Sequence, residues 1–359
     1  MPALMRAAVE GTLVVNGTTK NLAEAREYVE AGQVRLDAAQ NHNALGTYGA
    51  VISSKTPVFV VEDKASGERT FSAINEGRGK ALRYGANDES TLNQLRWLET
   101  AFAEVLGGVV RRSEGIDLVA ITEQAIRMGD EGHSRQKAGS LLFANTIAVQ
   151  LISEGAAGPL VQKALGFLVH NEFFYLSLSM ASAKCAIKAA EGVSDTTIVT
   201  CMAFNGSQFG MQVSGKPGRW YVSPVPEISG KYFEGYSKED ACPVVGDSEI
   251  AETIGLGAFA MAAAPALAPY IGGTPADAAN MAERMYDITC AEHPRFRIPA
   301  WEFRGTPFGI DIARVLNTGI TPIFSTGIAH RKPGLGQIGA GAGRAPFAAF
   351  QEAGKDLGL

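Results

Sequence analysis

The middle of the chain contains five consecutive helical patterns with no strand pattern between them, and the first is expected to end at Gly107-Gly108. The loops between these patterns are short, which favours helices that pack as antiparallel neighbours. Mixed patterns of strands and helices lie on both sides of this run. At 359 residues the chain is long enough for two or three domains. We therefore expect an N-terminal mixed α/β domain over 1–88, a helical domain over 89–195 and a C-terminal mixed α+β domain over 196–359.

Turn and capping residues define the expected elements of the two flanking regions. Asn21 can cap a helix that Gly32 ends, and Asn205-Gly206 is a hairpin signal between two strand patterns. The N-terminal region has strand patterns over 56–62 and 70–74. The expected elements of the C-terminal region are strands over 196–204, after Gly206, over 219–222 and over 321–326, and helices over 250–264 and 275–292.

The composition is that of a globular protein without a surface for nucleic acid. Hydrophobic residues make up 46% and charged residues 19%, and a net charge of −5 comes without basic runs. The start of the chain, MPALMRAAVEG, has an acidic residue and no long apolar core, so it does not match a secretory signal. The four cysteines form no CxxC pair, which predicts neither a zinc site nor a disulfide framework. Free thiols fit a reducing compartment, so we expect a cytoplasmic protein.

One uncharged stretch, residues 253–276, is long enough to span a bilayer. It is rich in Ala and Gly and contains three prolines, so we expect a buried, tightly packed helix and no membrane span. Residues 254–273 have little side-chain bulk, which suits close packing inside the domain or at a subunit contact. We therefore expect a homo-oligomer or an assembly with partner subunits.

The segment MGDEGHSRQKAGS (128–140) concentrates charged residues between two helical patterns. His133 is a candidate for polarising a carbonyl or transferring a proton, and Asp130 or Glu131 could orient its ring or bind a metal. Arg135, at a helix start, could hold an anion together with free backbone amides. The alternative interpretation is a polar turn whose charges cap helix ends. The segment has no HExxH spacing, so it gives only weak support to a zinc hydrolase.

The segment STGIAHRKPGLGQIGAGAGRAP (325–346) is the second concentration of polar and glycine residues. Three of its glycines match GxGxxG, but too few residues follow for the βαβ unit that a dinucleotide fold needs. The glycines would let backbone N–H groups face an anion, and nearby cations would add charge. A plain surface loop is the alternative. The residues expected to act here are His330, Arg331, Lys332, Gly334, Gly336 and Gly339.

Four weaker segments add candidates. The segment INEGRGKALRYG (74–85) follows a strand pattern and places Asn75 and Arg78 where phosphate or carboxylate contact is plausible. Arg304 in FRGTPFGIDIARV (303–315) and Asn205 at the hairpin turn are further anion-binding candidates. The segment AQNHNALGTYGAV (39–51) reads slightly better as a polar loop than as a site. The acids of VGDSEIAET (245–253) could bind a ligand, although capping is the commoner role of such acids.

Six spaced motifs occur in order along the chain: MGDEGHSRQ, NEFFYLSLSMA, VTCMAFNGSQFGMQVSG, GDSEIAET, FRGTPFGIDI and STGIAHRKPGLGQIGAG. Together they resemble the YlbE/YahG-like family, long described as a domain of unknown function. The resemblance implies an α+β fold with a small helical domain between two mixed domains, which agrees with the three regions above. One branch of the family is the YlbE-like subunit of oxamate carbamoyltransferase. That branch implies purine and allantoin nitrogen catabolism, and partner subunits of FdrA-like and YlbF-like type.

The resemblance implies phosphorolysis of oxalurate to oxamate and carbamoyl phosphate. Phosphate needs a cationic cradle, which the 331–344 segment and Arg135 could form, and the developing oxyanion could be stabilised by His133 or His330. This chemistry needs no side-chain nucleophile and no cofactor, although a divalent metal is possible. Two alternatives stay open. One is a metal-assisted amidohydrolase that uses Asp130, Glu131 and His133, and the other is a subunit that binds a ligand without doing chemistry.

The two main polar segments are expected to meet. We expect His133, Arg135, His330 and Arg331 around one cleft, because glycine-bearing breaks beside buried elements are usual places for active-site loops. The cleft should prefer a small anion over a metal or nucleotide, because no acid accompanies the cations between residues 329 and 350.

Overall fold

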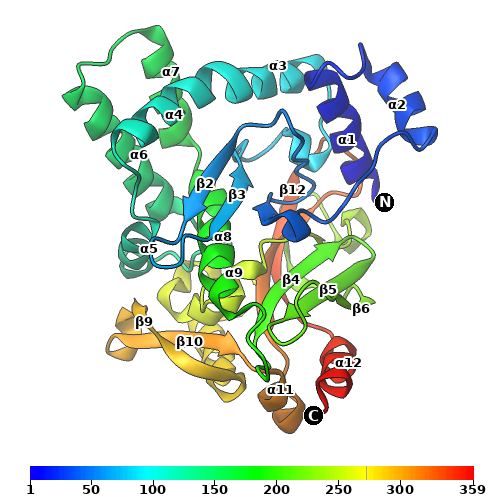
Figure 1. Cartoon of the computed structure of the whole chain (residues 1–359), viewed down its shortest axis with the longest axis vertical. Helices are drawn as coiled ribbons and strands as arrows, with labels where there is room; N and C mark the ends of the chain where they lie inside the picture. Colours follow the sequence, from blue (N-terminus) through cyan, green and yellow to red (C-terminus); the bar gives the residue numbers. More distant parts are fainter. Residues whose placement is uncertain (272) are drawn as a thin grey trace.

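The computed structural model of the protein describes residues 1–271 and 273–359. The expected helical run is present: in Figure 1, α4 to α7 lie at the left, α3 runs along the top and α8 lies at the centre. Its helices are α3 (Glu89–Trp97), α4 (Ala103–Arg112), α5 (Leu118–Arg127), α6 (Lys137–Ser153), α7 (Pro159–His170) and α8 (Phe174–Ile187). The expected stop at Gly107-Gly108 is wrong. The helix continues to Arg112 because Leu106 and Val109, on either side of the glycines, are both buried, and this packing offsets the helix cost of glycine of about 1 kcal/mol each.

Helix α8 joins the helical lobe to the rest of the molecule. Twelve of its fourteen residues are buried, and it packs against the strands of the N-terminal sheet as well as against α5, α6 and α9 (Ile250–Thr253). A helix that is buried on all sides has no polar face, which explains why apolar and small residues fill most of its positions, and the one charged side chain, Lys184, is buried in an ion pair with Glu191. Motif residues of α8 therefore lie at the centre of the molecule.

The N-terminal region packs two helices beside a small mixed sheet. Helix α1 (Ala3–Val15) was not expected from the sequence, whereas α2 (Leu22–Glu30) is capped as predicted, since the Asn21 side chain accepts a hydrogen bond from the Glu24 N–H at 3.0 Å. The sheet has the order β1-β3-β2, in which β1 and β3 are parallel and β2 and β3 antiparallel. Its strands are β1 (Ala44–Leu45), β2 (Val58–Glu62) and β3 (Arg69–Ala73).

The C-terminal region contains three separate sheets. The predicted Asn205-Gly206 hairpin joins β4 and β5 in an antiparallel sheet of order β6-β5-β4-β8. The other sheets have the orders β11-β12-β7 and β10-β9, and both are antiparallel. The strands are β4 (Val199–Asn205), β5 (Gln208–Val213), β6 (Tyr221–Pro224), β7 (Ser229–Tyr232), β8 (Val245–Gly246), β9 (Thr289–Ile298), β10 (Arg304–Ile310), β11 (Ile323–Ala329) and β12 (Gln337–Arg344).

The glycine-rich segment is largely a strand, which corrects the expected anion-binding loop. Only Gly334 and Gly336 have positive φ angles and lie in the turn before β12. Gly339 and Gly341 lie in β12, between β11 and β7, where an added Cβ would come within 2.5 Å of backbone carbonyl oxygens of β7. These glycines therefore permit close approach of a neighbouring strand, one of the uses of glycine inside a sheet.

The two long helices expected after residue 250 are shorter than predicted. Helix α9 ends at Thr253 because Gly255 has a φ of 83° and lies against β10, where a Cβ would meet the Pro307 carbonyl oxygen at 2.7 Å. A 3-10 segment over Gly257–Ala263 follows, and residue 272 of the Ala/Gly-rich stretch lies outside the described residues. Helix α10 (Pro275–Glu283) gives way to β9, because pairing with β10 decides the structure there.

The remaining helices, α11 (Ile312–Thr318) and α12 (Phe347–Leu357), cover the lower end of the molecule in Figure 1. Helices and several small sheets are segregated along the chain, which confirms the α+β fold. One buried cluster joins all three regions, since it contains Leu45, Met180 and Phe296. In the described part of the chain, no helix is both long and apolar enough to cross a bilayer.

Candidate functional site

The loop between α5 and α6 is held by its own two acids. The Glu131 carboxylate accepts the backbone N–H groups of residues 133, 134 and 135 at 3.2, 2.5 and 2.9 Å. The Asp130 carboxylate accepts the N–H of Gly139 in the first turn of α6 at 2.8 Å. The amides that Arg135 was expected to share with an anion are therefore occupied by Glu131. The interpretation of these acids as caps of a polar turn is the one that this geometry supports.

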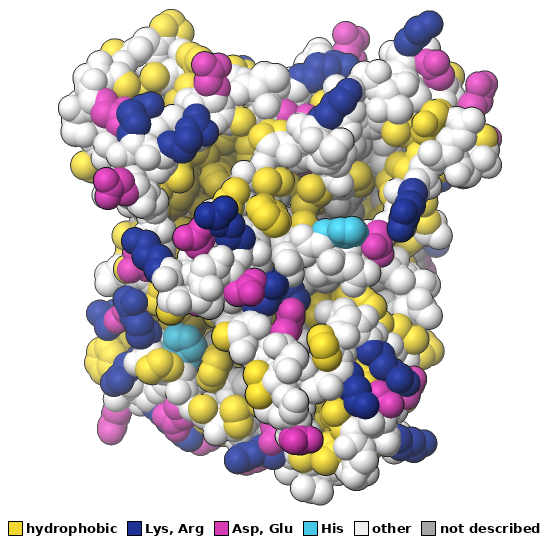
Figure 2. Space-filling view, in the orientation of Figure 1, with side chains coloured by type: hydrophobic (Ala, Val, Ile, Leu, Met, Phe, Trp, Pro, Cys, Tyr) yellow, Lys and Arg dark blue, Asp and Glu magenta, His cyan; other side chains and the backbone are white. Residues whose placement is uncertain are grey.

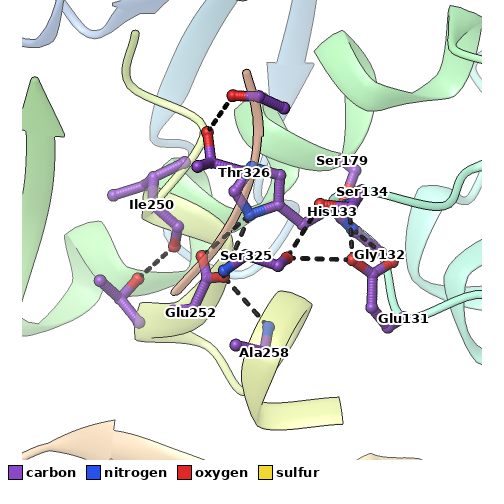
Figure 3. Close-up of polar contacts among 12 residues, drawn as sticks. Glu131, Gly132, His133, Ser134, Ser179, Ile250, Glu252, Ala258, Ser325 and Thr326 are labelled. Atoms are coloured by element: carbon purple, nitrogen blue, oxygen red, sulfur yellow. Dashed lines mark hydrogen bonds and ion pairs between the residues drawn. The ribbon is translucent and has the colours of Figure 1, made fainter. Parts of the chain in front are cut away.

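His133 lies inside the molecule and faces a carboxylate from another region. Its Nδ1 atom is 3.0 and 3.2 Å from the two oxygens of Glu252, and its side chain is 4% exposed (Figure 3). Glu252 also accepts the N–H groups of Ala258 and Ser325, at 3.1 and 3.2 Å. The Ser325 hydroxyl lies 3.2 Å from Glu131, so strand β11 closes the cluster. Three segments far apart in sequence meet here.

The carboxylates around His133 decide its charge. Burial alone would lower the pKa of the imidazole, but Glu252, Glu249 and Glu131 outweigh it and raise the pKa to about 9. A group with this pKa is an imidazolium at neutral pH and can donate hydrogen bonds from both ring nitrogens. His133 is therefore a buried cation and a possible proton donor.

Two further acids extend the cluster along the loop that follows β8. Burial raises the pKa of Glu249 to about 8, and the negative charges of Glu252 and Asp247 act in the same direction. Burial likewise raises the pKa of Asp247 to about 7. Neither acid caps α9, which has only four residues and no side-chain cap. The sequence signal is the density of acids, with three within six residues, but capping is the commoner role of such acids and hides it.

A cavity of about 790 Å³ lies beside this loop. Asp247 lines it together with Gln40, whose Nε2 atom donates to Asp247 Oδ2 at 3.3 Å. Asn205 also lines it, so one predicted residue belongs here, while Gln40, Tyr48 and Asp247 were not among the predicted site residues. All three residues come from 39–51 and 245–253, two segments in which the sequence gives only weak signs of a site. The structure brings these segments together.

A second group of predicted residues meets at the surface. The Gly334 N–H donates to the Tyr84 carbonyl at 2.9 Å, and a Cβ on Gly336 would lie 2.9 Å from the carbonyl oxygen of Gly79. The segments around 74–85 and 330–336 are thus in direct contact, although about 250 residues separate them in sequence. Arg331 and Lys332 are both exposed here. The sequence did not predict this contact. The expected meeting of 128–140 with 325–346 is made by Ser325, whose hydroxyl lies 3.0 Å from that of Ser134, and not by His330 or Arg331.

Within this surface group, several predicted residues already have partners in the chain. Arg78 lies 4.3 Å from the centre of the Phe173 ring and 3.7 Å from Glu172. Asn75 is buried, and its side chain accepts the Gly77 N–H at 2.9 Å. His330 is also buried, and its Nδ1 accepts the Lys332 N–H at 2.8 Å. Arg78 is exposed as well, but it pairs with Glu172, as Lys80 does with Asp88. In the described part of the chain, Arg331 and Lys332 are exposed cations of this group without an ion pair.

Two other predicted residues lie away from both groups. Arg304 pairs with Glu292 at 2.8 Å and covers the ring of Tyr286 at 3.5 Å, so its charge is already matched on the β9–β10 ribbon. Gly339 lies within β12. His133 and His330 share no partner in the contacts described. They therefore belong to two separate groups of residues and do not line the single cleft that the sequence predicts. Over residues 1–271 and 273–359, no three His, Cys, Asp or Glu side chains are placed to hold a metal ion.

Comparison with known proteins shows to which family the chain belongs. A family model described as oxamate carbamoyltransferase subunit AllG matches residues 34–248. Oxamate carbamoyltransferase subunit AllG of Escherichia coli (strain K12) is 39% identical over 355 residues, which cover 98% of this chain and 85% of that protein. The chain belongs to the AllG family. The resemblance that its six motifs predict is confirmed.

Two further proteins are similar to this chain over nearly its whole length. The uncharacterized protein YahG of the same organism is 37% identical over 353 residues, which cover 98% of this chain and 75% of YahG. A crystal structure of a conserved protein of unknown function from Enterococcus faecalis V583 matches with a TM-score of 0.97 and 39% identity, over 99% of this chain and 86% of that one. The fold of that crystal structure therefore extends over nearly the whole of this chain.

Proposed function

We propose that the chain is a subunit of an oxamate carbamoyltransferase-type enzyme. The observation that carries the proposal is the 39% identity to subunit AllG across nearly the whole chain. The reaction is phosphorolysis of oxalurate. A phosphate oxygen attacks the carbamoyl carbon, the bond from that carbon to the oxamate nitrogen breaks, and the nitrogen takes a proton. The products are oxamate and carbamoyl phosphate.

The two groups of residues suit different parts of this reaction. Arg331 and Lys332 are exposed cations beside a glycine turn and suit a phosphate dianion, which gains from fixed positive charge. The protonated His133 suits the other requirement, which is a proton for the leaving nitrogen or a donor for the developing oxyanion. Partner subunits of FdrA-like and YlbF-like type would complete a site that neither group forms alone.

A second candidate is a subunit that binds a ligand without doing chemistry. The specific observation that favours it is the separation of His133 from Arg331, since the two lie in groups with no common partner. In that case the catalytic residues would come from the partner subunits. The metal-assisted amidohydrolase has weaker support, because Asp130 and Glu131 are occupied with backbone amides.

The deciding experiment is a carbamoyl phosphate assay with oxalurate and phosphate, using the chain alone and then mixed with its candidate partner subunits. We expect product only from the mixture, and we expect His133→Gln to lower kcat at least about tenfold if the imidazolium acts in the reaction. Wild-type turnover with His133→Gln in an otherwise complete mixture would favour the binding-subunit role. No product from any mixture would contradict the proposal.

A further inference from the structure

Helix α6, at the left of Figure 1, has an apolar side that faces solvent. Leu141, Val149 and Ile152 are all exposed, and Ile152, at 73%, is the most exposed large hydrophobic side chain in the described part of the chain. No charged residue lies between Lys137 and Glu154. A surface helix ordinarily carries charged residues on its outer side, whereas a helix that is apolar all round is buried. The outer side of α6 therefore has the composition of a buried surface.

The fold of the single chain does not need these outer residues. Phe143, Ile147 and Leu151, on the inner side of α6, belong to the buried core of the helical region and attach the helix to its neighbours. Apolar surface left in water forgoes about 25 cal/mol for each Å² that could be covered. Single exposed apolar residues are ordinary, but several on one helix side indicate an interaction surface.

The outer residues also have the spacing of a coiled-coil seam. Leu141, Asn145, Ala148 and Ile152 follow one another at intervals of four, three and four residues. Ala148 is half-buried and the other three are exposed. Side chains at these intervals form one line along a helix, and in coiled coils that line packs against a second helix. The partner that this surface fits is therefore another helix.

The order of the intervals fits a second copy of this chain. Because the intervals read the same in both directions, an antiparallel α6 of a second copy would place its Ile152 opposite Leu141. The same arrangement would place Ala148 opposite Asn145. A single polar residue in such a seam selects register and orientation at some cost in stability, and Asn145 is the residue that would do so here.

The charges at the two ends of α6 favour the antiparallel orientation. It brings the Lys137 end of one helix beside the Glu154 end of the other, and the two helix dipoles then oppose each other. Lys137 already pairs with Glu172 at 2.6 Å, and Glu154 with Arg112 at 2.5 Å, so the contact would extend two existing ion pairs. A parallel arrangement would instead place like charges together at each end.

We propose that two copies of this chain associate through the outer side of α6, packed antiparallel, with Leu141 of one copy against Ile152 of the other. Helix α7, which packs against α6, has further exposed apolar residues in Leu160 and Val169. One or two helices from each copy are expected to bury less than the standard interface of about 1,600 Å². The dimer should therefore be weak, with a Kd in roughly the micromolar range. This inference does not depend on the proposed function.

The first test is the concentration dependence of the molecular mass. Sedimentation velocity of the full chain from about 1 to about 100 µM should show a change from monomer to dimer. Ile152→Lys should raise the Kd at least about tenfold, because it would bury a charge in the contact. The variant should fold normally, since the side chain is exposed, and thermal unfolding checks this. Val193→Lys, at an exposed apolar residue in the loop before β4, is the matched control and should associate like the wild type.

Disulfide cross-linking tests the orientation. The background is Cys290→Ser, which removes an exposed thiol. Leu141→Cys and Ile152→Cys together should give a cross-linked dimer under mild oxidation, and either variant alone should not. Along one helix these two positions are about 16 Å apart, whereas the Cα atoms of a disulfide are about 4.4–6.8 Å apart. A disulfide in the double variant therefore has to join two copies.

A monomer at every concentration, or equal association of the wild type and Ile152→Lys, would overturn the inference. Cross-linking by Ile152→Cys alone would overturn the antiparallel arrangement. If the wild type stayed monomeric and Ile152→Lys abolished binding of a candidate partner subunit, the surface would belong to that subunit and the second copy would be the wrong occupant. None of these measurements uses an activity assay, so a failure of the carbamoyl phosphate assay would not change their result.

Discussion

At the residue scale, the central feature is a buried cation surrounded by acids. His133 holds its proton only because Glu252, Glu249 and Glu131 surround it, and Glu249 and Asp247 in turn have raised pKa values. The folded state therefore binds more protons than the unfolded chain near neutral pH. By linkage, such a protein loses stability as the pH rises.

We expect stability to fall between about pH 6.5 and pH 9. The folded pKa of His133 is raised to about 9 from the unfolded value of 6.5, so its contribution is complete below 6.5 and lost as the pH passes 9. At 1.36 kcal/mol per pKa unit, the contribution is about 3 kcal/mol. Urea unfolding across this range should show the decline in the wild type and a weaker decline in His133→Gln, in which Glu249 and Asp247 still titrate. Identical slopes for the two proteins would contradict the assignment of the proton to His133.

Glu131 should matter more for stability than an exposed acid does. It accepts three backbone N–H groups and the Ser325 hydroxyl, and a glutamine can offer only one oxygen to them. Leaving buried donors unsatisfied costs about 1–3 kcal/mol each. We expect Glu131→Gln to lower the free energy of unfolding by at least about 2 kcal/mol, measured by denaturant titration. Glu27→Gln, on the exposed part of α2, serves as the control and should change it by less than about 0.5 kcal/mol.

At the element scale, the glycine strand β12 distinguishes two uses of glycine. A glycine can provide a flexible turn, as Gly334 and Gly336 do, or remove a side chain where two strands come close, as Gly339 and Gly341 do. The sequence pattern GxGxxG is the same for both uses, and only the pairing with β7 and β11 separates them. The turn of the expected anion loop exists, but the strand begins at residue 337, and anion binding by the turn stays a prediction.

Alanine substitutions can measure this difference. In Gly341→Ala the new Cβ would lie 2.5 Å from the Ser229 carbonyl oxygen, so β7 must move. The free energy of unfolding should therefore fall by about 1–3 kcal/mol. In Gly166→Ala, within α7, the Cβ meets nothing within 4 Å, and the better helix propensity should add up to about 1 kcal/mol. Thermal unfolding of both variants would test the pair. Equal effects of the two would mean that β12 is not packed as described.

Local signals predicted the elements whose formation depends on local residues. The Asn21 cap and the Asn205-Gly206 hairpin are correct, because capping and turn chemistry act within a few residues. The errors lie where distant contacts decide. Gly255 ends α9 because β10 lies against it, and β9 replaces the end of a predicted helix because β10 pairs with it. The sequence of either segment alone does not contain its partner.

At the scale of the whole molecule, the site residues divide into a buried group and a surface group. The face seen in Figure 2 has both signs of charge interspersed, with hydrophobic side chains gathered in the hollow between the helical lobe and the N-terminal helices. The polar composition of each segment could be predicted from the sequence, but the meeting of residues 39–51 with 245–253 could not. That meeting depends on how three regions pack around one core.

The surface group gives a test of anion binding by the whole chain. We expect phosphate to raise the thermal stability of the wild type, by about 2.7 kcal/mol at 100 times its Kd. Arg331→Ala should lose this effect because its side chain is an exposed cation, whereas Arg304→Ala should keep it because Glu292 and Tyr286 already occupy Arg304. Thermal shift measurements with phosphate, oxamate, magnesium, zinc and ATP provide the comparison. If Arg304→Ala lost the phosphate effect and Arg331→Ala kept it, the result would indicate an anion site on the β9–β10 ribbon instead.

Helix α1 lines the cavity through Met5 and Val9, and Met1, just before the helix, lines it too. Pro2 lies against the β4–β5 turn, where a Cβ on Gly206 would come within 2.2 Å of its ring. Anything fused ahead of Met1 would therefore start at the rim of the cavity. An affinity tag placed there could fill the space that a ligand needs and give a false negative in a binding measurement. Leu359, at the other end, is 56% exposed and does not line the cavity. Purification handles for this protein therefore belong at the carboxyl terminus.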